Sequence, residues 1–252
     1  MRYASIFQIL VDLKKDSIPT FIPTFNQPTL LKMTLEQLDG KSDNIVVYDN
    51  ASTSEDMLEL LEEISGDIDV VFSNKNTGPR IFTEDIQILS LMPDYFVVTD
   101  PDLIYNDLLP KGHLNELKKI INMNKLAKAG FAIEIYDPEE QDRFLDKDSV
   151  LKWEEPYWSN EIGTTTTLDR IYDAWIDTTY ALNKRDACLY HRKFGKPTFR
   201  YPSVRISGKY TCRHIGWWKK ELIPQPEDEI NNYLNTQLWS HTENHYYRGI
   251  KR

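Results

Sequence analysis

Residues 95–102 read Tyr-Phe-Val-Val-Thr-Asp-Pro-Asp, an apolar run that ends in two aspartates separated by one proline. Tyr, Phe and Val favour extended structure, and a continuous apolar run is typical of a strand that is buried on both faces of a parallel sheet. Open α/β sheets bind their ligands beyond the carboxyl ends of such strands. This stretch therefore predicts a buried strand that brings Asp100 and Asp102 to a ligand site.

Similar apolar runs alternate with helical patterns along the first half of the chain. The predicted strands are 19–25, 44–49, 69–73, 95–99 and 128–135, and the predicted helices are 28–38, 54–64, 84–91 and 114–127. This alternation is the signature of βα units around a mostly parallel sheet. We therefore expect an α/β fold with a central, mostly parallel sheet flanked by helices.

The pattern changes after residue 136. The expected elements are a solvated helix in 137–155, a strand at 174–182, strand and loop at 197–212, and a closing helix at 227–239. Neither an internal repeat nor a low-complexity linker divides the chain. We expect a single domain over 1–252, in which 137–252 brings the substrate to the first half.

Charge and cysteine content restrict the function classes. The 252 residues contain 30 Lys plus Arg and 39 Asp plus Glu, a formal net charge of −9, which argues against a general nucleic-acid-binding surface. Two cysteines, Cys188 and Cys212, are too few and too far apart for a metal knuckle or a disulfide framework. We expect buried thiols and a reducing, cytoplasmic location.

The sequence also bears on membranes. It contains no apolar run near the roughly 18 residues that a spanning helix needs. Residues 6–13 predict a short amphipathic helix that packs on the body or touches a membrane or a partner.

Polar residues follow four successive predicted strands. They are Thr24 and Asn26, then 49–52, then 74–80, then Asp100 and Asp102. Each cluster alone is also typical of an ordinary turn, but their coincidence indicates a ligand site. Because the sequence has neither a dinucleotide glycine motif nor a P-loop, a phosphate-bearing ligand would need a cation, which the two aspartates can hold.

Four strings together carry a family resemblance. Pro-Thr-Phe-Asn at 23–26, Val-Tyr-Asp-Asn-Ala-Ser at 47–52, Asn-Thr-Gly-Pro-Arg at 76–80 and Thr-Asp-Pro-Asp at 99–102 resemble the nucleotide-sugar half of GT-A glycosyltransferases, particularly the family-2-like bacterial enzymes. The last string is similar to their D-x-D motif. The resemblance covers about residues 18–136 and is looser beyond. It implies a Rossmann-like GT-A fold with a nucleotide-sugar-binding half at 1–136 and an acceptor-binding half at 137–252.

The resemblance also implies a ligand and a cofactor: a nucleoside-diphosphate sugar, above all a UDP-sugar, and Mn²⁺ or Mg²⁺. Thr24 and Asn26 match positions near the base and the ribose, and Asp49 matches the carboxylate that holds the base. The third-strand loop beside the nucleotide contributes Asn76, Gly78 and Arg80, of which Arg80 would pair with a phosphate. Asn50 and Ala51 depart from the family pattern, in which acidic or glycine residues are frequent.

Metal and diphosphate contacts complete the expected donor site. In the resemblance, Asp102 touches the metal directly and Asp100 acts through water or the ribose. Many GT-A enzymes add a histidine from the C-terminal half, which implies His214 as a ligand, and imidazole beside a carboxylate suits Mn²⁺; a structural hydrogen-bonding role is the alternative. Arg205 and Arg213 are candidates to neutralise the diphosphate, or else surface charge.

Acceptor and base assignments rest on residue chemistry. Trp158 and Trp217 are aromatic platforms for a sugar ring, or core residues. An inverting transferase needs a carboxylate that takes the proton of the acceptor hydroxyl. Asp177 is our candidate, with Glu161 and Asp169 as alternatives, and the family's x-E-D motif is not plainly present.

We therefore expect a metal-dependent glycosyltransferase that moves a sugar from a nucleotide sugar to a hydroxyl of a glycan acceptor. Abundant Lys, Asn and Ile with few Gly are compatible with surface polysaccharide synthesis in a bacterium. A lipid-linked acceptor and contact with the inner face of a membrane stay open. The alternatives are a nucleotidyltransferase, which should carry a Gly- and Lys/Arg-rich loop after its first strand, and a catalytically silent GT-A domain that binds glycans or serves assembly.

Overall fold

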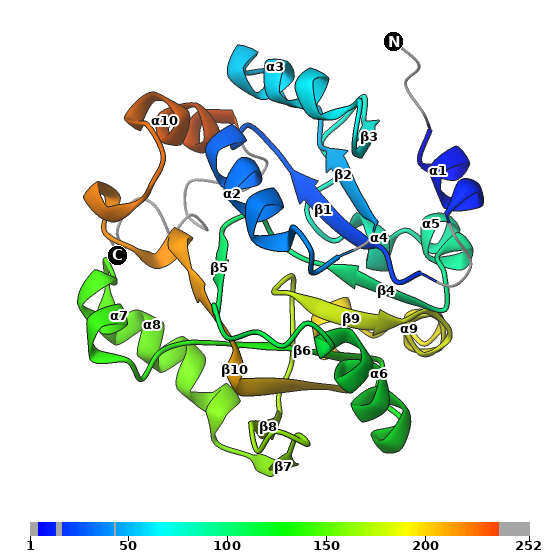
Figure 1. The fold of residues 1–252 in the computed structure, drawn as a ribbon, viewed down its shortest axis with the longest axis vertical. Helices are drawn as coiled ribbons and strands as arrows, with labels where there is room; N and C mark the ends of the chain where they lie inside the picture. Colours follow the sequence, from blue (N-terminus) through cyan, green and yellow to red (C-terminus); the bar gives the residue numbers. More distant parts are fainter. Residues whose placement is uncertain (1–4, 14–16, 43, 237–252) are drawn as a thin grey trace.

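The structure is a computed structural model that describes residues 5–13, 17–42 and 44–236 (Figure 1). Its strands are β1 (Thr20–Thr24), β2 (Ile45–Asp49), β3 (Asp69–Phe72), β4 (Tyr95–Val98), β5 (Leu103–Tyr105), β6 (Lys128–Ile133), β7 (Glu161–Thr164), β8 (Arg170–Asp173), β9 (Ala181–Lys184) and β10 (Ser203–His214). Its α-helices are α1 (Ile6–Asp12), α2 (Pro28–Leu38), α3 (Glu55–Ile64), α4 (Ile81–Glu84), α5 (Ile86–Leu91), α6 (His113–Asn124), α7 (Pro138–Arg143), α8 (Lys147–Glu154), α9 (Arg185–Lys193) and α10 (Glu227–Thr236).

One ten-stranded sheet runs through the described residues in the order β3-β2-β1-β4-β9-β6-β10-β8-β7, and β5 pairs with β10 beside this path. The first four strands are mutually parallel, as the βα alternation predicts, and β6 is parallel to β10. An antiparallel strand, β9, lies between β4 and β6 and joins the two parallel parts. The α/β fold with a largely parallel sheet is confirmed.

Both faces of the sheet are covered at β1, β2 and β4, which explains why these strands are mostly apolar and buried. Successive residues of β1 show this: Phe21 packs in one apolar cluster and Ile22 in the other, and both are fully buried. The cluster around Phe21 includes Ile6 and Ile9 of α1. The N-terminal helix therefore packs on the body, the first of its two expected roles.

The helices predicted at 84–91 and 137–155 are each interrupted, so that two short helices take the place of one. Asp85 accepts hydrogen bonds from the backbone N–H of Gln87 and Ile88 and starts α5 directly after α4. In 137–155, Asp137 caps α7 and Asp146 caps α8 in the same way. An aspartate side chain that accepts from the next turn favours a new helix start over continuation.

The strand expected at 174–182 is present only as β9. Ala174 and Ile176 are buried while Trp175 and Asp177 are exposed, so the alternation is strand-like. Side chains satisfy these carbonyl groups in place of a neighbouring strand: Trp175 O accepts from Arg205 Nε and Ile176 O from Lys128 Nζ. The alternation of buried and exposed residues does not distinguish a strand paired with a neighbour from an extended segment whose carbonyl groups accept from side chains.

Other elements were not predicted or differ in extent. The sequence analysis missed β5, the β7–β8 hairpin and α9, and the element expected at 197–212 is a short 3₁₀ turn followed by β10. The closing helix is confirmed as α10 up to Thr236, and positions 237–239 lie outside the described residues. None of the described helices has the length and apolar character that crossing a bilayer requires. Cys188 and Cys212 are buried free thiols, as expected.

A buried histidine gives the fold a pH dependence. His113 Nδ1 lies 3.0 Å from Pro110 O, an acceptor, so this nitrogen donates, and Nε2 accepts from the Tyr180 hydroxyl at 2.7 Å. Burial lowers the pKa of His113 to about 4. The folded state therefore holds the imidazole neutral, and its stabilising contribution is present above pH 6.5 and is lost as the pH falls toward 4.

We expect the free energy of unfolding to fall by about 2 kcal/mol between pH 7 and pH 5 on account of His113 alone. Glutamine cannot titrate, so His113→Gln should be less stable than the original protein at pH 7. Its free energy of unfolding should, however, fall by about 2 kcal/mol less than that of the original protein between pH 7 and pH 5. Urea unfolding of both proteins at pH 5 and pH 7 measures the difference. Equal drops in the two proteins would contradict the assignment.

Candidate active site

The strand ends bring the predicted donor-site residues to one edge of the sheet. Thr24 and Asp49 are register partners at the ends of β1 and β2, and Asp100 follows β4 on the other side of β1. The pairing of β10 with β5 sets His214 opposite Leu103, the residue after Asp102. A residue from the C-terminal half thus reaches the first half through strand register.

Asp102 and His214 are in contact at this edge. His214 Nε2 lies 3.6 Å from Asp102 Oδ2, and the backbone N–H of Ile215 donates to Asp102 O at 2.9 Å. Trp217 stacks on the imidazole with 4.6 Å between ring centroids and so fixes the plane of the ring. A Cβ added at Gly216 would lie 2.9 Å from His214 Cε1 and 3.1 Å from Asp102 Oδ2. Only glycine leaves room for this approach.

The two aspartates have an excess of negative charge. Burial, followed by the charge of Asp102, raises the pKa of Asp100 well above its ordinary value. Asp102 Oδ1 is buried and has no hydrogen-bond partner among the described residues. An unsatisfied carboxylate oxygen next to a second carboxyl group and an imidazole fits a hard or borderline divalent cation.

The expected metal set of Asp100, Asp102 and His214 is not complete. In the described parts of the chain, no three His, Cys, Asp or Glu side chains are arranged to hold a metal ion. Asp102 and His214 offer two protein ligands. The backbone N–H of Asp100 donates to Thr178 O at 3.2 Å.

Asp49 and Asn26 build the turn that leads into α3. Both carboxylate oxygens of Asp49 accept from the Ser52 N–H, at 3.1 and 3.2 Å, and burial raises its pKa. Asn26 Oδ1 accepts from the N–H groups of Thr53 and Ser54 at 2.8 and 3.0 Å. Next to them, Thr24 Oγ1 is buried with no hydrogen-bond partner in the described structure.

Helix α10 covers this part of the edge, which the sequence analysis did not foresee. Asn26 Nδ2 donates to Asn232 Oδ1 at 3.1 Å and to Thr236 Oγ1 at 3.0 Å. Glu229 accepts from the Thr29 hydroxyl at 2.6 Å at the start of α2. No motif in 227–236 signals such a role, because the contacts depend on tertiary packing across more than 200 residues.

Arg80 and Asp177 meet beside Asp100. Arg80 Nε donates to Asp177 Oδ1 at 2.6 Å, and Arg80 Nη2 contacts the other carboxylate oxygen. The turn before Arg80 is built locally: Asn76 Oδ1 accepts from the N–H of Gly78, which has a positive φ of 79° that favours glycine. The candidate base and the candidate phosphate ligand are therefore paired with each other.

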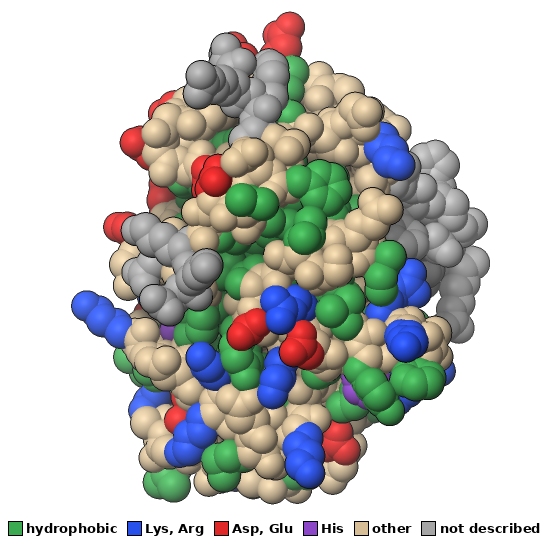
Figure 2. All heavy atoms as spheres, turned by 90° about the vertical axis from the view of Figure 1, so that its right-hand side faces the viewer, with side chains coloured by type: hydrophobic (Ala, Val, Ile, Leu, Met, Phe, Trp, Pro, Cys, Tyr) green, Lys and Arg blue, Asp and Glu red, His purple; other side chains and the backbone are tan. Residues whose placement is uncertain are grey.

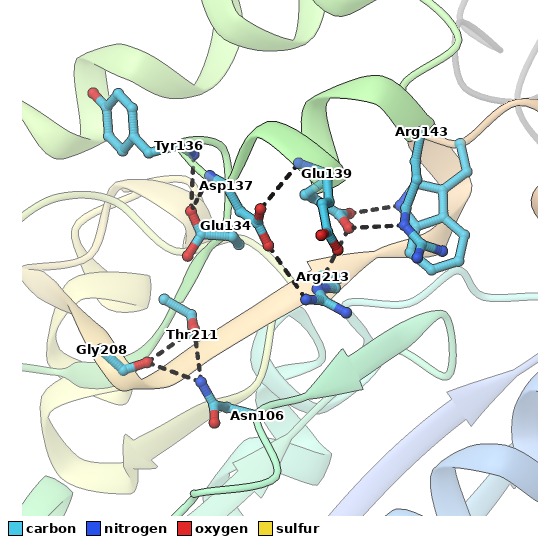
Figure 3. Close-up of polar contacts among 11 residues, drawn as sticks. Asn106, Glu134, Tyr136, Asp137, Glu139, Arg143, Gly208, Thr211 and Arg213 are labelled. Carbon is cyan, nitrogen blue, oxygen red and sulfur yellow. Dashed lines mark hydrogen bonds and ion pairs between the residues drawn. The ribbon is translucent and has the colours of Figure 1, made fainter.

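Three charged candidates make structural contacts within the described residues. Buried Arg205 forms an ion pair with Glu154 at 2.7 Å, so it is neither surface charge nor available to a diphosphate. Arg213 pairs with Asp137 and Glu140, each at 3.4 Å (Figure 3). Asp169 accepts from Thr165 Oγ1 at 3.1 Å and from the N–H of Lys209 at 3.0 Å and so closes the β7–β8 turn.

The remaining candidates lie apart from the cluster or are buried. Glu161, like Asp169, belongs to the β7–β8 hairpin, and β8 is four strands from β4, roughly 19 Å at the usual strand spacing. Trp217 is 5% exposed and packs on His214, so it is a core residue and not a sugar platform. Trp158 is half-buried and packs edge-to-face with Tyr136, which is 54% exposed.

Neither a family model nor a curated protein matches the sequence. The fold is similar to a crystal structure of GalNAc-T7 with UDP, GalNAc and Mn²⁺, with a TM-score of 0.50 and 11% sequence identity. The similarity covers 80% of this chain and 44% of that chain, so this chain spans less than half of the neighbour's length. The architecture is thus that of GT-A glycosyltransferase structures.

Two further solved structures have TM-scores below 0.5. HddC from Yersinia pseudotuberculosis has a TM-score of 0.45 and 9% identity, with 85% of this chain and 96% of that chain covered. Mannose-6-phosphate isomerase from Helicobacter pylori has a TM-score of 0.37 and 15% identity, with 77% and 87% covered.

Gly216→Ala should separate His214 from Asp102, because its methyl group occupies the space between them. We expect Mn²⁺ affinity to fall by about tenfold or more, the usual effect of disturbing the groups that orient a metal ligand. Calorimetric titration with Mn²⁺ measures it. Gly112→Ala is the control, since a Cβ there meets nothing within 4 Å; equal affinity in both variants would show that the Asp102–His214 contact does not hold the ion.

Proposed function

We propose that this chain is a metal-dependent glycosyltransferase that moves a sugar from a nucleoside-diphosphate sugar, a UDP-sugar, to a hydroxyl of a glycan acceptor. The observation that carries the proposal is the Asp102–His214 contact at the carboxyl edge of the sheet, with a buried oxygen of Asp102 that has no hydrogen-bond partner there. The similar fold of GalNAc-T7, solved with UDP and Mn²⁺, supports the same donor and metal.

The donor would bind along the ends of β1, β2 and β4. Thr24 supplies a buried hydroxyl that has no hydrogen-bond partner within the described residues, and Asp49 and Asn26 lie beside it for the base and the ribose. Asn76, Gly78 and Arg80 form the neighbouring loop, with Arg80 directed at a phosphate. Because α10 holds the Asn26 amide, binding of the base requires α10 to exchange its contacts through Asn232 and Thr236.

Asp102 and His214 would hold Mn²⁺ or Mg²⁺, and Asp100 would act through water or the ribose. When bound, the ion neutralises the charge that develops on the leaving diphosphate. The protein's own contribution is placement, because strand register and the Trp217 ring fix both ligands before any ligand arrives. Such preorganisation lowers the barrier without a change of structure during the reaction.

Asp177 is the proposed base for the acceptor hydroxyl. In the structure both of its oxygens are paired with Arg80, so neither is in place to accept a proton from an acceptor hydroxyl. A diphosphate is a stronger partner for a guanidinium, so donor binding would draw Arg80 away and free Asp177. The base would then be active only when the donor is present.

The acceptor would lie against exposed aromatic rings. The Tyr136 ring packs edge-on against Trp158, with 5.2 Å between centroids, and offers an exposed face to a sugar. We propose that the acceptor is a glycan that is extended during surface polysaccharide synthesis. A catalytically silent GT-A domain is the second candidate, favoured by the α10 cover and by the pairing of Asp177 with Arg80.

Loss of the metal ligands tests the function. Asp102→Asn and His214→Gln should each abolish Mn²⁺-dependent UDP binding while the melting temperature stays close to that of the original protein, because neither side chain is in the apolar core. Asp107→Asn, an exposed carboxylate two residues beyond β5, is the control. UDP binding that needs neither residue would overturn the proposal, and binding without turnover of any UDP-sugar would support the silent domain.

Asp177→Asn tests the base. We expect kcat to fall by about 10²- to 10⁴-fold, the usual contribution of a general base, with UDP affinity retained because Arg80 keeps its positive charge for the phosphate. Glu161→Gln and Asp169→Asn should keep normal kcat. A normal kcat in Asp177→Asn would exclude Asp177 as the base and favour a retaining mechanism.

A further inference from the structure

Positive charge is concentrated in one part of this acidic chain. Residues 187–220 contain nine Lys and Arg and no Asp or Glu, although the chain as a whole has a net charge of −9. Some of these cations are buried or paired, as Arg205 and Arg213 are. The exposed ones gather at the end of α9 and in the loop that follows it.

Exposed aromatic rings lie among these cations. We define the α9 surface by residues Tyr190, Arg192, Lys193, Phe194, Lys196 and Arg200. Tyr190 is 61% exposed and Phe194 is 65% exposed, and their rings lie 4.9 Å apart. Arg192, Lys193, Lys196 and Arg200 are all exposed as well.

The α9 surface continues onto the segment that carries Asp177. The Arg200 guanidinium lies 5.1 Å from the centre of the Trp175 ring, which is 44% exposed. Trp175 is two residues from Asp177. The aromatic and basic surface therefore borders the candidate active site.

Figure 2 shows the side of the molecule to which α9 belongs in Figure 1. Acidic side chains gather at the upper left of this view, whereas Lys and Arg predominate in the lower half, next to apolar side chains. Along α9 the nearest acid is Asp186 in its first turn, about 10 Å from Lys193 at the helical rise. Glu84 of α4 also borders this surface: its backbone carbonyl accepts from Arg192 Nε at 3.0 Å, and its carboxylate accepts from Thr198 Oγ1 at 3.5 Å. The exposed cations of the α9 surface outnumber this acid, so the surface is a local exception to the charge of the protein.

We propose that the α9 surface docks the protein on an anionic lipid bilayer. Tyr, Trp and Phe rings sit at the level of lipid headgroups, and Lys and Arg next to them bind anionic headgroups, so this composition matches such a bilayer in both charge and polarity. Two exposed rings within contact of each other are costly in water but are stabilised in the headgroup region. A second copy is a poor occupant, because a symmetric contact would bring the same four cations together.

The docking goes beyond the transfer reaction, and one consequence rests on the proposed function. A protein held by the α9 surface would turn the segment around Asp177 toward the membrane. An acceptor carried by a lipid would then present its hydroxyl close to that carboxylate. The acceptor would accordingly be a glycan linked to a lipid, and not a free glycan.

Two matched double variants test the docking. Each replaces a lysine and the adjacent exposed aromatic residue: K193E/F194S on the α9 surface, and K152E/W153S on α8, where Trp153 is also 61% exposed. Co-sedimentation is measured with vesicles of equal parts phosphatidylcholine and phosphatidylglycerol, and with phosphatidylcholine alone. No donor or metal is added, so the result does not depend on the transfer reaction.

We expect the original protein and K152E/W153S to bind the mixed vesicles, bind phosphatidylcholine alone far more weakly, and release as salt is raised. K193E/F194S should bind about tenfold or more weakly, because one cation is reversed and one ring is lost. Unchanged melting temperatures exclude misfolding. No binding of the original protein to the mixed vesicles, or an equal loss in both variants, overturns the proposal.

Light scattering separates the remaining case. Three results together would show that the α9 surface is a contact between copies: the mass of the original protein doubles with concentration, the doubling is lost in K193E/F194S, and no protein sediments with the vesicles. The proposal would then be wrong. Mn²⁺-dependent UDP binding is measured on the same samples. Its failure would remove the proposed function and the lipid-linked acceptor, but not the docking.

Discussion

The pairing of β10 with β5 is the constraint on which the candidate site depends. Their register places His214 opposite Leu103 and so next to Asp102, although more than 100 residues separate the two in sequence. Around this contact, Gly216 leaves the space, the Ile215 N–H fixes the loop and Trp217 holds the ring. A change of register by one residue would turn His214 to the other face of the sheet and dissolve the site.

Local patterns in the sequence predict the parallel half of the fold and the edge where its strands end. They succeed for β1 to β4 because buried parallel strands are apolar throughout and polar turns follow them. The break between α7 and α8 was also accessible, since Asp137 and Asp146 are good N-cap residues. The strand order beyond β4 could not be predicted from the sequence. Strand β9 enters the sheet antiparallel between β4 and β6, and only tertiary packing decides that position.

The candidate site divides in the same way. Asp49, Asp100 and Asp102 could be placed because each lies at the end of a strand or within a few residues of it, and the chain order alone brings them to one edge. Arg205 was misjudged because its partner, Glu154, is 51 residues away and buried with it. The role of α10 was out of reach, because the Asn26 amide reaches it across 206 residues and polar residues at 227–236 also suit an exposed helix.

The amide of Asn26 joins α3 to α10. Its oxygen accepts hydrogen bonds from the N–H groups at the start of α3, and its nitrogen donates to Asn232 and Thr236 on α10. The two ends differ in what they tolerate. A carboxylate at position 26 would still accept from the start of α3, and α10 could answer it only by turning the NH₂ group of Asn232 inward and donating the Thr236 hydroxyl. An apolar side chain at position 26 would release both elements at once, so the start of α3 and the α10 cover share one anchor.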